Sequence, residues 1–400
     1  MKNKLNNNIK LEYLYCFLKN IDMSASIWVL YLIYKGIPLW QIGLLEAIFH
    51  ITSFLSELPT GAMADLFGRK KVLIIGRICS VIASILMILS KGFWGIAISF
   101  VFSAWGYNLN SGSEEALVYD TMKLLGRERE YIIVNSRLNV IIEAVQGISV
   151  FIGGILAEYS YTFCYLAAVI ITIISMLPAI LFQEPELLTL SDSDQKDKNL
   201  WSHFKLCLET LKESKKIQNI LFFYPITFTF YTVMYFYGQK YFSDYGLNKI
   251  QISIIMLMGG LVSCLGAVSC NAILKICKDK TKYITSISMG IAIMGLYFHN
   301  LTFAIVLFAI SSYINALLYP IQSDSLNKLI PSEQRATIIS VNSMLFSFMM
   351  ILIFPLVGFI AETIGLNITF LLLGIFQLIL VLLLLMRRQK NHRIASQVTE

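Results

Sequence analysis

Residues 61–71 read GAMADLFGRKK, a charged, glycine-containing stretch between two long apolar runs. The run before it, residues 39–59, and the run after it, residues 72–90, are each long enough to cross about 30 Å of hydrocarbon as a helix. Three consecutive cations end the stretch, and such clusters beside membrane helices favour the cytoplasmic side. Residues 61–71 are therefore predicted to form a cytoplasmic hairpin turn between two membrane-spanning helices.

The composition of the whole chain agrees with a membrane protein. Of its 400 residues, 56% are apolar and 14% are charged, whereas soluble domains carry about 25% charged residues. Apolar segments that each suit one span recur along the chain. They are residues 11–34, 39–60, 72–90, 93–118, 134–157, 161–182, 219–242, 250–274, 283–299, 301–322, 337–360 and 367–386. The sequence thus predicts an all-α polytopic membrane protein with twelve transmembrane helices.

The distribution of basic residues supports this count. If both termini are cytoplasmic, only Lys35, Lys91, Lys240 and Lys249 of the 32 lysines and arginines fall in outer loops. This asymmetry is the positive-inside pattern. We therefore expect both termini in the cytoplasm. The compact loops between the spans favour a bacterial plasma membrane. The net charge of +7 then reflects membrane orientation, so no nucleic-acid partner is expected.

A polar stretch, residues 183–218, separates the first six spans from the last six. Its second part, residues 200–217, puts apolar side chains on one helical face, which predicts an amphipathic helix on the inner membrane surface. A solvated linker is the alternative. We therefore divide the chain into an N-terminal six-helix bundle, this linker, and a C-terminal bundle with a short basic tail. The bundles are residues 1–182 and 219–400.

The two halves repeat one another. Residues 154–158 (GILAE) correspond to residues 358–362 (GFIAE), and Asp120 after the fourth span corresponds to Asp324 after the tenth. Parallel repeats related by an axis along the membrane normal are typical of transporters, whose substrate site lies near the midplane between the repeats.

The pattern G-x-x-x-D-x-x-G-R-K at residues 61–70 resembles the signature loop of the major facilitator superfamily (MFS) of transporters. With the 6+6 arrangement and the repeat, the resemblance covers essentially the whole chain and implies the MFS fold, two pseudo-symmetric six-helix bundles. In the family this loop is a cytoplasmic latch. The matching residues are Gly61, Asp65, Gly68, Arg69 and Lys70.

The resemblance also implies partners for the latch. Asp65 is expected to face the N-terminal end of the eleventh helix, where a carboxylate is stabilised by the helix dipole. Arg69 is expected to pair with Asp120 at the inner end of the fourth helix. That these charges only anchor the topology is the alternative.

Acidic residues inside the spans are candidates for proton coupling, because a charge at the centre of a membrane helix costs about 2.5–3.5 kcal/mol on insertion scales. Glu143 and Asp22 fall near the midplane. Glu143 has no cation within four residues and is our first choice, since a lone carboxylate there suits proton binding near neutral pH. Asp22 has Lys19 one turn away, so an internal ion pair is the alternative. Glu46 lies nearer the outer end of its helix.

Glu114 and Glu115 adjoin the inner end of the fourth span. Successive helical positions point about 100° apart, so at most one of them is expected to face a central cavity. The other is expected at the cytoplasmic surface or near Arg127. The fourth span lacks the arginine that drug/proton antiporters of the superfamily carry, and no arginine is expected near the midplane. In the fifth span, Val150 replaces the proline of their glycine-rich motif.

The seventh span is dense in aromatic residues, most of which are expected to meet lipid or neighbouring helices. Those on the cavity side would offer π faces to an apolar or cationic molecule. The second half has no acid at the centre of a span, so coupling is expected in the first half. Our candidates for the substrate cavity are Tyr231, Tyr235 and Phe228, with the polar Asn315 and Gln322 of the tenth span.

These features favour a monomeric secondary transporter that exports amphipathic, cationic small molecules in exchange for protons by alternating access. A proton-coupled uptake symporter for a small solute is the alternative, and a non-transporting receptor or scaffold is a third. The expected partners are a small-molecule substrate and the lipid bilayer. No enzyme activity, cofactor or metal site is expected, because the cysteines and histidines are dispersed. The ATP-binding loop G-x-x-x-x-G-K-S/T is missing, so an ion gradient is expected to supply the energy.

Overall fold

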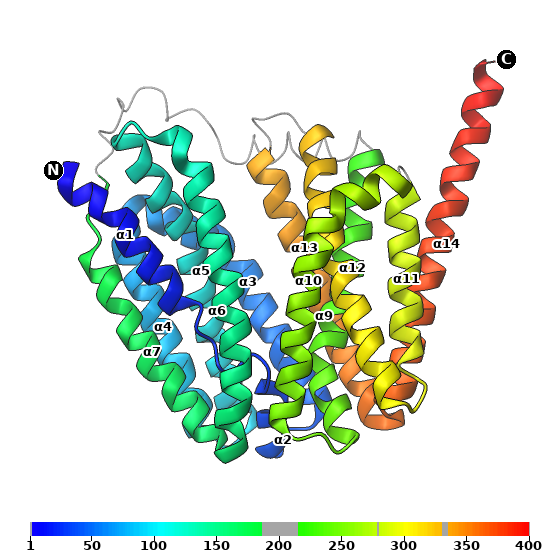
Figure 1. The fold of residues 1–400 in the computed structure, drawn as a ribbon, viewed down its shortest axis with the longest axis horizontal. Helices are drawn as coiled ribbons and strands as arrows, with labels where there is room; N and C mark the ends of the chain where they lie inside the picture. Colours follow the sequence, from blue (N-terminus) through cyan, green and yellow to red (C-terminus); the bar gives the residue numbers. More distant parts are fainter. Residues whose placement is uncertain (1, 186–214, 278–279, 330–334, 400) are drawn as a thin grey trace. The chain divides into compact units, whose positions relative to one another are not determined.

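The computed structural model describes residues 2–185, 215–277, 280–329 and 335–399, which form helices joined by short turns and contain no strand (Figure 1). The α-helices are α1 (Lys2–Lys19), α2 (Trp28–Tyr34), α3 (Leu39–Phe67), α4 (Arg69–Leu89), α5 (Phe93–Leu124), α6 (Tyr131–Tyr159), α7 (Tyr161–Leu181), α9 (Lys215–Asp244), α10 (Lys249–Cys277), α11 (Thr281–Gly295), α12 (Leu301–Leu329), α13 (Arg335–Ile364) and α14 (Leu366–Thr399). A short 3-10 helix, η1 (Glu128–Glu130), precedes α6.

In the described part of the chain, nine helices are long and apolar enough to cross a membrane. The predicted spans outside these nine are residues 11–34, 93–118 and 283–299. α5 is long, but buried polar residues such as Asn108, Asn110 and Glu114 lower its hydropathy. α11 has only 15 residues. The chain is an all-α, multi-pass membrane protein, as the sequence predicts.

The prediction of one continuous helix over residues 11–34 is wrong. α1 ends at Lys19 and α2 begins at Trp28, so residues 20–27 break the helix (dark blue in Figure 1). Nδ2 of Asn20 donates to the carbonyl of Cys16 at 2.8 Å, and the backbone N–H of Ser24 donates to Oδ1 of Asp22 at 2.9 Å. Such local side-chain bonds compete with helical hydrogen bonds, which explains the break.

The signature stretch is also shorter as a turn than predicted. α3 continues through Pro59 to Phe67, and α4 begins at Arg69. Gly68 alone joins them, with φ of 89°, a conformation that favours glycine. Most of the predicted hairpin turn is therefore the last two turns of α3.

The helices group into two compact units. The N-terminal unit contains α1 to α7 with the segments Asn248–Leu257 and Met350–Pro355, and the C-terminal unit contains α9, α11, α12, α14 and the rest of α10 and α13. The predicted amphipathic helix at residues 200–217 falls outside the described residues, apart from its last three, which begin α9.

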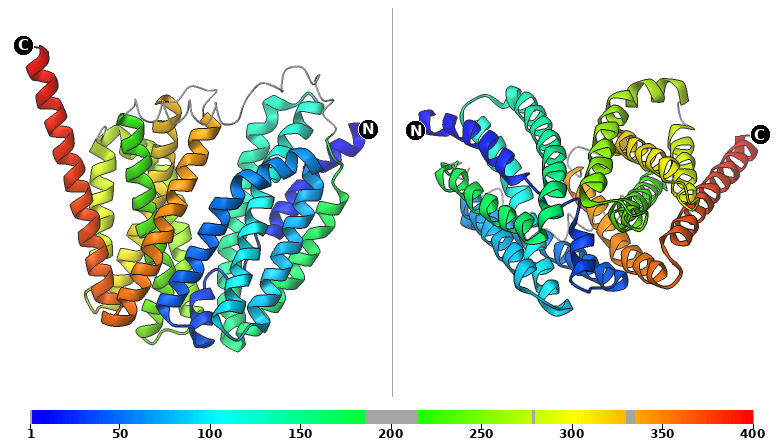
Figure 2. Two further views of the ribbon diagram at one scale, coloured as in Figure 1. Left: turned by 180° about the vertical axis from the view of Figure 1, so that it is seen from behind. Right: turned by 60° about the horizontal axis from the view of Figure 1, so that its bottom comes forward.

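The same helix pairings occur in both units, which are seen from two further sides in Figure 2. In the N-terminal unit, α4 and α1 each pack against α5 and α7. In the C-terminal unit, α11 and α9 each pack against α12 and α14. These pairings relate the third and first spans of each half to the fourth and sixth, so the internal repeat read from the sequence is present in the packing.

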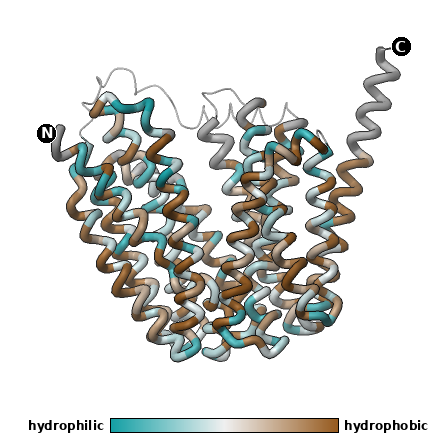
Figure 3. Tube along the Cα trace, viewed as in Figure 1, coloured by the Kyte–Doolittle hydropathy of each residue, from teal (hydrophilic) through white to brown (hydrophobic). Residues whose placement is uncertain are grey.

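Hydrophobic residues run along the helices of both units, and hydrophilic residues gather at the helix ends (Figure 3). The core of the N-terminal unit forms where α1, α4, α5 and α7 meet. Its fully buried members are Tyr15, Leu73, Leu117, Ala179 and Phe182. Polar groups next to this apolar core are costly unless they have partners or a function.

Candidate functional site

A buried group of charges lies beside this core where α1 meets α5. Nζ of Lys19 forms an ion pair with Oε2 of Glu114, and the two side chains are 22% and 11% exposed. Glu12, about two helical turns before Lys19 on α1, is 1% exposed. Both of its carboxylate oxygens lack a hydrogen-bond partner among the described residues. We call Glu12, Lys19 and Glu114 the acid–base cluster.

The chemistry of the acid–base cluster suits a proton. Glu114 and Lys19 are the two charged groups that act on Glu12. Two carboxylates can hydrogen-bond each other only when one carries a proton, and an ionised carboxylate without a donor is costly in an apolar interior. A proton shared between Glu12 and Glu114 would satisfy both groups, with Lys19 balancing the remaining charge.

Neutral and basic groups frame the acid–base cluster. The hydroxyl of Tyr15 donates to Oδ1 of Asn110, and Nδ2 of Asn110 donates to the carbonyl of Gly106 at 2.6 Å. Arg77, the ninth residue of α4, is 7% exposed, and its Nε donates to Oγ of Ser175 at 2.9 Å. The expectation that no arginine lies deep in the membrane part is therefore wrong. Arg77 escaped notice because it lies within a run that is otherwise apolar.

Sequence reasoning missed Glu12 for a different reason. It placed the start of the first span at residue 11, so Glu12 fell at the helix end, where acids are ordinary. Because α1 begins at Lys2, Glu12 instead lies in the middle of the helix and is buried. Residues 2–10 contain four asparagines, which are weak helix formers, so the sequence carries no clear signal for this earlier helix start.

The latch residues lie together at the junction of α3 and α4. Nη2 of Arg69 is 2.8 Å from Oδ2 of Asp120, the pair that the resemblance implies. The carboxylate of Glu184, which follows α7, accepts hydrogen bonds from the backbone N–H groups of Arg69 at 2.8 Å and Lys70 at 2.9 Å. Glu184 thus caps the N-terminus of α4, where a negative charge is stabilised by the helix dipole. In the sequence, Glu184 belongs to the polar stretch of residues 183–218, and nothing there predicts this contact.

For two latch residues, Gly61 and Asp65, the structure shows less than the resemblance implies. Gly61 lies within α3 and is helical, so of the two motif glycines only Gly68 has a positive φ. The side chain of Asp65 lies outside the described residues, so its expected place at the eleventh helix stays a prediction.

The acids chosen from the sequence occupy varied surroundings. Oε1 of Glu46 is 3.6 Å from Nε2 of His50, one turn along α3. Asp22 lies in the break between α1 and α2 and bonds Ser24, whereas Lys19 pairs with Glu114, so the alternative ion pair of Lys19 with Asp22 is not formed. Glu143 on α6 is exposed on the surface of the chain.

Glu115 is exposed, while its neighbour Glu114 is buried. Arg127 does not bind Glu115. It donates two hydrogen bonds to the carboxylate of Glu130, at 3.0 and 2.6 Å. Arg127 also donates to Oδ1 of Asn6 at 3.0 Å, which ties the start of α1 to the loop before α6.

The candidates for the substrate cavity lie in the C-terminal unit. The hydroxyl of Tyr231 on α9 donates to Oγ of Ser312 on α12 at 3.2 Å, and the ring of Tyr235 stacks on Phe308 with centroids 5.8 Å apart. Nε2 of Gln322 donates to Oδ1 of Asn342 at 2.6 Å. Two candidates lie apart from these pairs: Phe228 packs between the rings of Tyr224 and Tyr319, and Asn315 is half-buried on α12.

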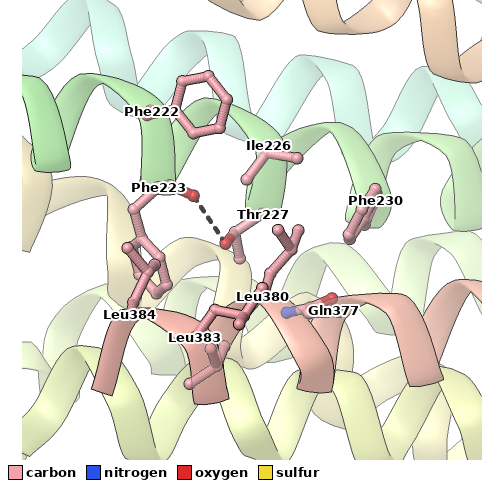
Figure 4. A pocket seen from close by; sticks show the side chains of 10 residues that line it. Phe222, Phe223, Ile226, Thr227, Phe230, Gln377, Leu380, Leu383 and Leu384 are labelled. Atoms are coloured by element: carbon pink, nitrogen blue, oxygen red, sulfur yellow. Dashed lines mark hydrogen bonds between the residues drawn. The ribbon is translucent and has the colours of Figure 1, made fainter. Parts of the chain in front are cut away.

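A pocket of about 160 Å³ lies between α9 and α14 in the C-terminal unit (Figure 4). Its walls are mainly phenylalanine and leucine side chains, with Gln377 at one end and Thr227 bonded to its own helix at the carbonyl of Phe223. None of the cavity candidates chosen from the sequence lines it. Its apolar lining suits a hydrocarbon chain better than a charged solute.

Comparison with known proteins agrees with the fold. The family profile described as Major Facilitator Superfamily matches residues 16–298 and 283–400. YxaM of Bacillus subtilis (strain 168), described as an uncharacterised MFS-type transporter, is 25% identical over 397 residues, which cover 94% of each chain.

Two solved structures have a similar fold. A variant of the nucleoside transporter NupG gives a TM-score of 0.77 at 15% identity, covering 95% of this chain and 98% of that one. A bacterial homologue of the human lysosomal transporter Spinster, in an inward-facing and unoccupied conformation, gives 0.74 at 14% identity, covering 95% and 96%. Identities this low describe a shared fold and carry no information about substrate.

Proposed function

Since this chain belongs to the major facilitator superfamily and is a membrane transporter and not an enzyme, we propose that it exports amphipathic cationic molecules in exchange for protons. The proposed location is the plasma membrane, with both termini in the cytoplasm and the chain acting as a monomer. The energy comes from the proton gradient, without a cofactor.

The acid–base cluster is the observation that carries this proposal. It puts two carboxyl groups and one ammonium group in the interior of the N-terminal unit, and Glu12 has no donor of its own. Ionisable groups at membrane depth are expensive, so they are kept where they move ions or protons. A shared proton on Glu12 and Glu114 can leave and return without breaking other hydrogen bonds of Glu12.

Export of cations is supported by the aromatic side chains of α9. It is also supported by acidic groups in the N-terminal unit that form no ion pair among the described residues, namely Glu12 and Asp22. Aromatic faces attract organic cations, and carboxylates neutralise them.

A dye-exclusion assay tests the proposal. Cells lacking their own drug pumps would express the parent chain, Glu12→Gln, Glu114→Gln or Glu143→Gln, and ethidium accumulation would be followed with and without a protonophore. We expect the parent to lower ethidium accumulation and the protonophore to abolish this effect. Glu12→Gln or Glu114→Gln should reduce exclusion at least tenfold, whereas Glu128→Gln, at an exposed position of η1, should not change it.

Two results would count against the proposal. If cells with confirmed membrane expression accumulate as much ethidium as cells without the protein, export of lipophilic cations is rejected. Exclusion that persists after collapse of the proton gradient would reject proton coupling. If only Glu143→Gln loses exclusion, the coupling site lies on α6, as the sequence first indicated, and the acid–base cluster is structural.

A further inference from the structure

The break between α1 and α2 is an unusual feature for a membrane protein. The seven residues of α2 span about 10 Å. Residues 20–27, which precede α2, therefore lie about 10 Å inside the outer end of the first span and not at its edge. Non-helical backbone at membrane depth is tolerated only where it is buried in protein or lines an aqueous cavity. In transporters, interrupted helices hold ions and charged substrate groups.

The broken segment is fixed to two neighbouring helices. Oγ of Ser26 donates to the carbonyl of Val150 on α6 at 3.0 Å, and Sγ of Cys164 on α7 donates to the carbonyl of Met23 at 3.1 Å. α6 approaches closely at Gly153, where a Cβ atom would lie 1.8 Å from the carbonyl oxygen of Met23. The irregular conformation is therefore held in place by tertiary contacts.

Asp22 in this segment is exposed, and one of its carboxylate oxygens accepts no hydrogen bond from the described residues. Its Oδ1 accepts hydrogen bonds from the backbone N–H of Ser24 at 2.9 Å and from Oγ of Ser24 at 2.6 Å. Among the described residues no lysine or arginine pairs with Asp22, because Lys19, the nearest in the chain, is bound to Glu114. The C-terminal end of α1 directly precedes the segment and adds the negative end of its dipole.

A second polar group at the break is also uncommitted. Tyr165 on α7 is 4% exposed, and its hydroxyl has no hydrogen-bond partner in the described part of the chain. Asp22 is one of the charges that act on this hydroxyl, and Ser24 is its polar neighbour. A buried hydroxyl without a partner costs about 1–3 kcal/mol, so such groups are normally satisfied by water or by a ligand.

We infer that the break between α1 and α2 is a binding site for a monovalent cation, held by the carboxylate of Asp22 and the hydroxyl of Tyr165. The cation is either the ammonium group of an organic substrate or a sodium ion, since both bind carboxylate and hydroxyl oxygens. The organic case rests on the proposed function, whereas the sodium case does not.

Binding to purified protein in lipid nanodiscs tests the inference without any transport step. The two probes are ethidium, whose binding is followed by fluorescence, and sodium ion. Sodium binding is measured as protection of the protein against thermal unfolding, compared with an equal concentration of potassium. We expect Asp22→Asn to weaken binding of the active probe at least tenfold and Tyr165→Phe several-fold. Matched controls are Asp244→Asn, which alters an exposed ion pair with Lys240, and Tyr159→Phe, a tyrosine that is 80% exposed.

Tyr165→Phe guards against misfolding as an explanation, because it removes a single hydroxyl and keeps the buried ring. Saturable ethidium binding lost in both site variants supports a site for an organic cation, and sodium protection lost in both supports a sodium site. Binding that is unchanged in both variants, or parent protein that responds to neither probe, overturns the inference. If the site variants lose binding while the parent shows no proton-driven export, the cation site stands and the proposed function fails.

Discussion

Lys19 of α1 pairs with Glu114 of α5 and not with Asp22, although Asp22 is only three residues further along the chain. The ion pair holds the ammonium group inside the N-terminal unit and leaves Asp22 without a cation. Lys19 could therefore pair with either of two acids. It binds Glu114 in the acid–base cluster and not Asp22 in the break of the first span.

This arrangement predicts that Glu114 controls the cation site indirectly. Glu114→Gln removes the partner of Lys19, and the long lysine side chain is then free to reach Asp22. We expect binding of whichever probe is active in nanodiscs, ethidium or sodium, to weaken about tenfold in Glu114→Gln. Adding Lys19→Met should restore it, because the competing ammonium group is gone. Weak binding in the double variant would show that Glu114 acts in another way.

The same ion pair should contribute to stability. Removing one partner of a buried pair costs about 3–5 kcal/mol, because the remaining charge is left uncompensated, and the partial exposure of this pair favours the lower end. We expect Lys19→Met to lower the melting temperature in detergent clearly, and Lys19→Met with Glu114→Leu to recover much of the loss.

The exposed pair of Lys240 and Asp244 provides the comparison for that measurement. Surface ion pairs contribute about 0–1 kcal/mol, so Lys240→Met should barely change the melting temperature. Equal losses at the two pairs would contradict a buried role for Lys19.

The sequence predicted the fold well because hydrophobic span length and basic loops are local signals. The twofold repeat and the pairing of Arg69 with Asp120 also followed from short motifs. What it missed depends on tertiary contacts. The burial of Glu12 follows from where α1 starts, and the partner of Lys19 lies 95 residues away. The break at residues 20–27 was hidden because its polar residues alternate with apolar ones and the segment lies between apolar runs.

Glu184 shows the same limit, since nothing near it in the sequence indicates that it caps α4. Its carboxylate holds the N–H groups of Arg69 and Lys70, so Glu184→Ala should destabilise the start of α4 by about 1 kcal/mol. We expect faster hydrogen exchange at residues 69–72 and a melting temperature lower by a few degrees. Glu128→Ala is the control, and unchanged exchange in Glu184→Ala would show that the cap is not needed.

Gly153 is predicted to be essential for the shape of the break. A Cβ atom there would lie 1.8 Å from the carbonyl oxygen of Met23, a contact that only a backbone shift can relieve. Gly153→Ala should therefore displace the segment beside Asp22, lower the melting temperature and abolish cation binding. Gly112→Ala, where a Cβ meets no atom within 4 Å, should be neutral or slightly stabilising because alanine favours a helix. Normal cation binding by Gly153→Ala, measured with the same nanodisc titration, would show that α6 does not hold the break in place.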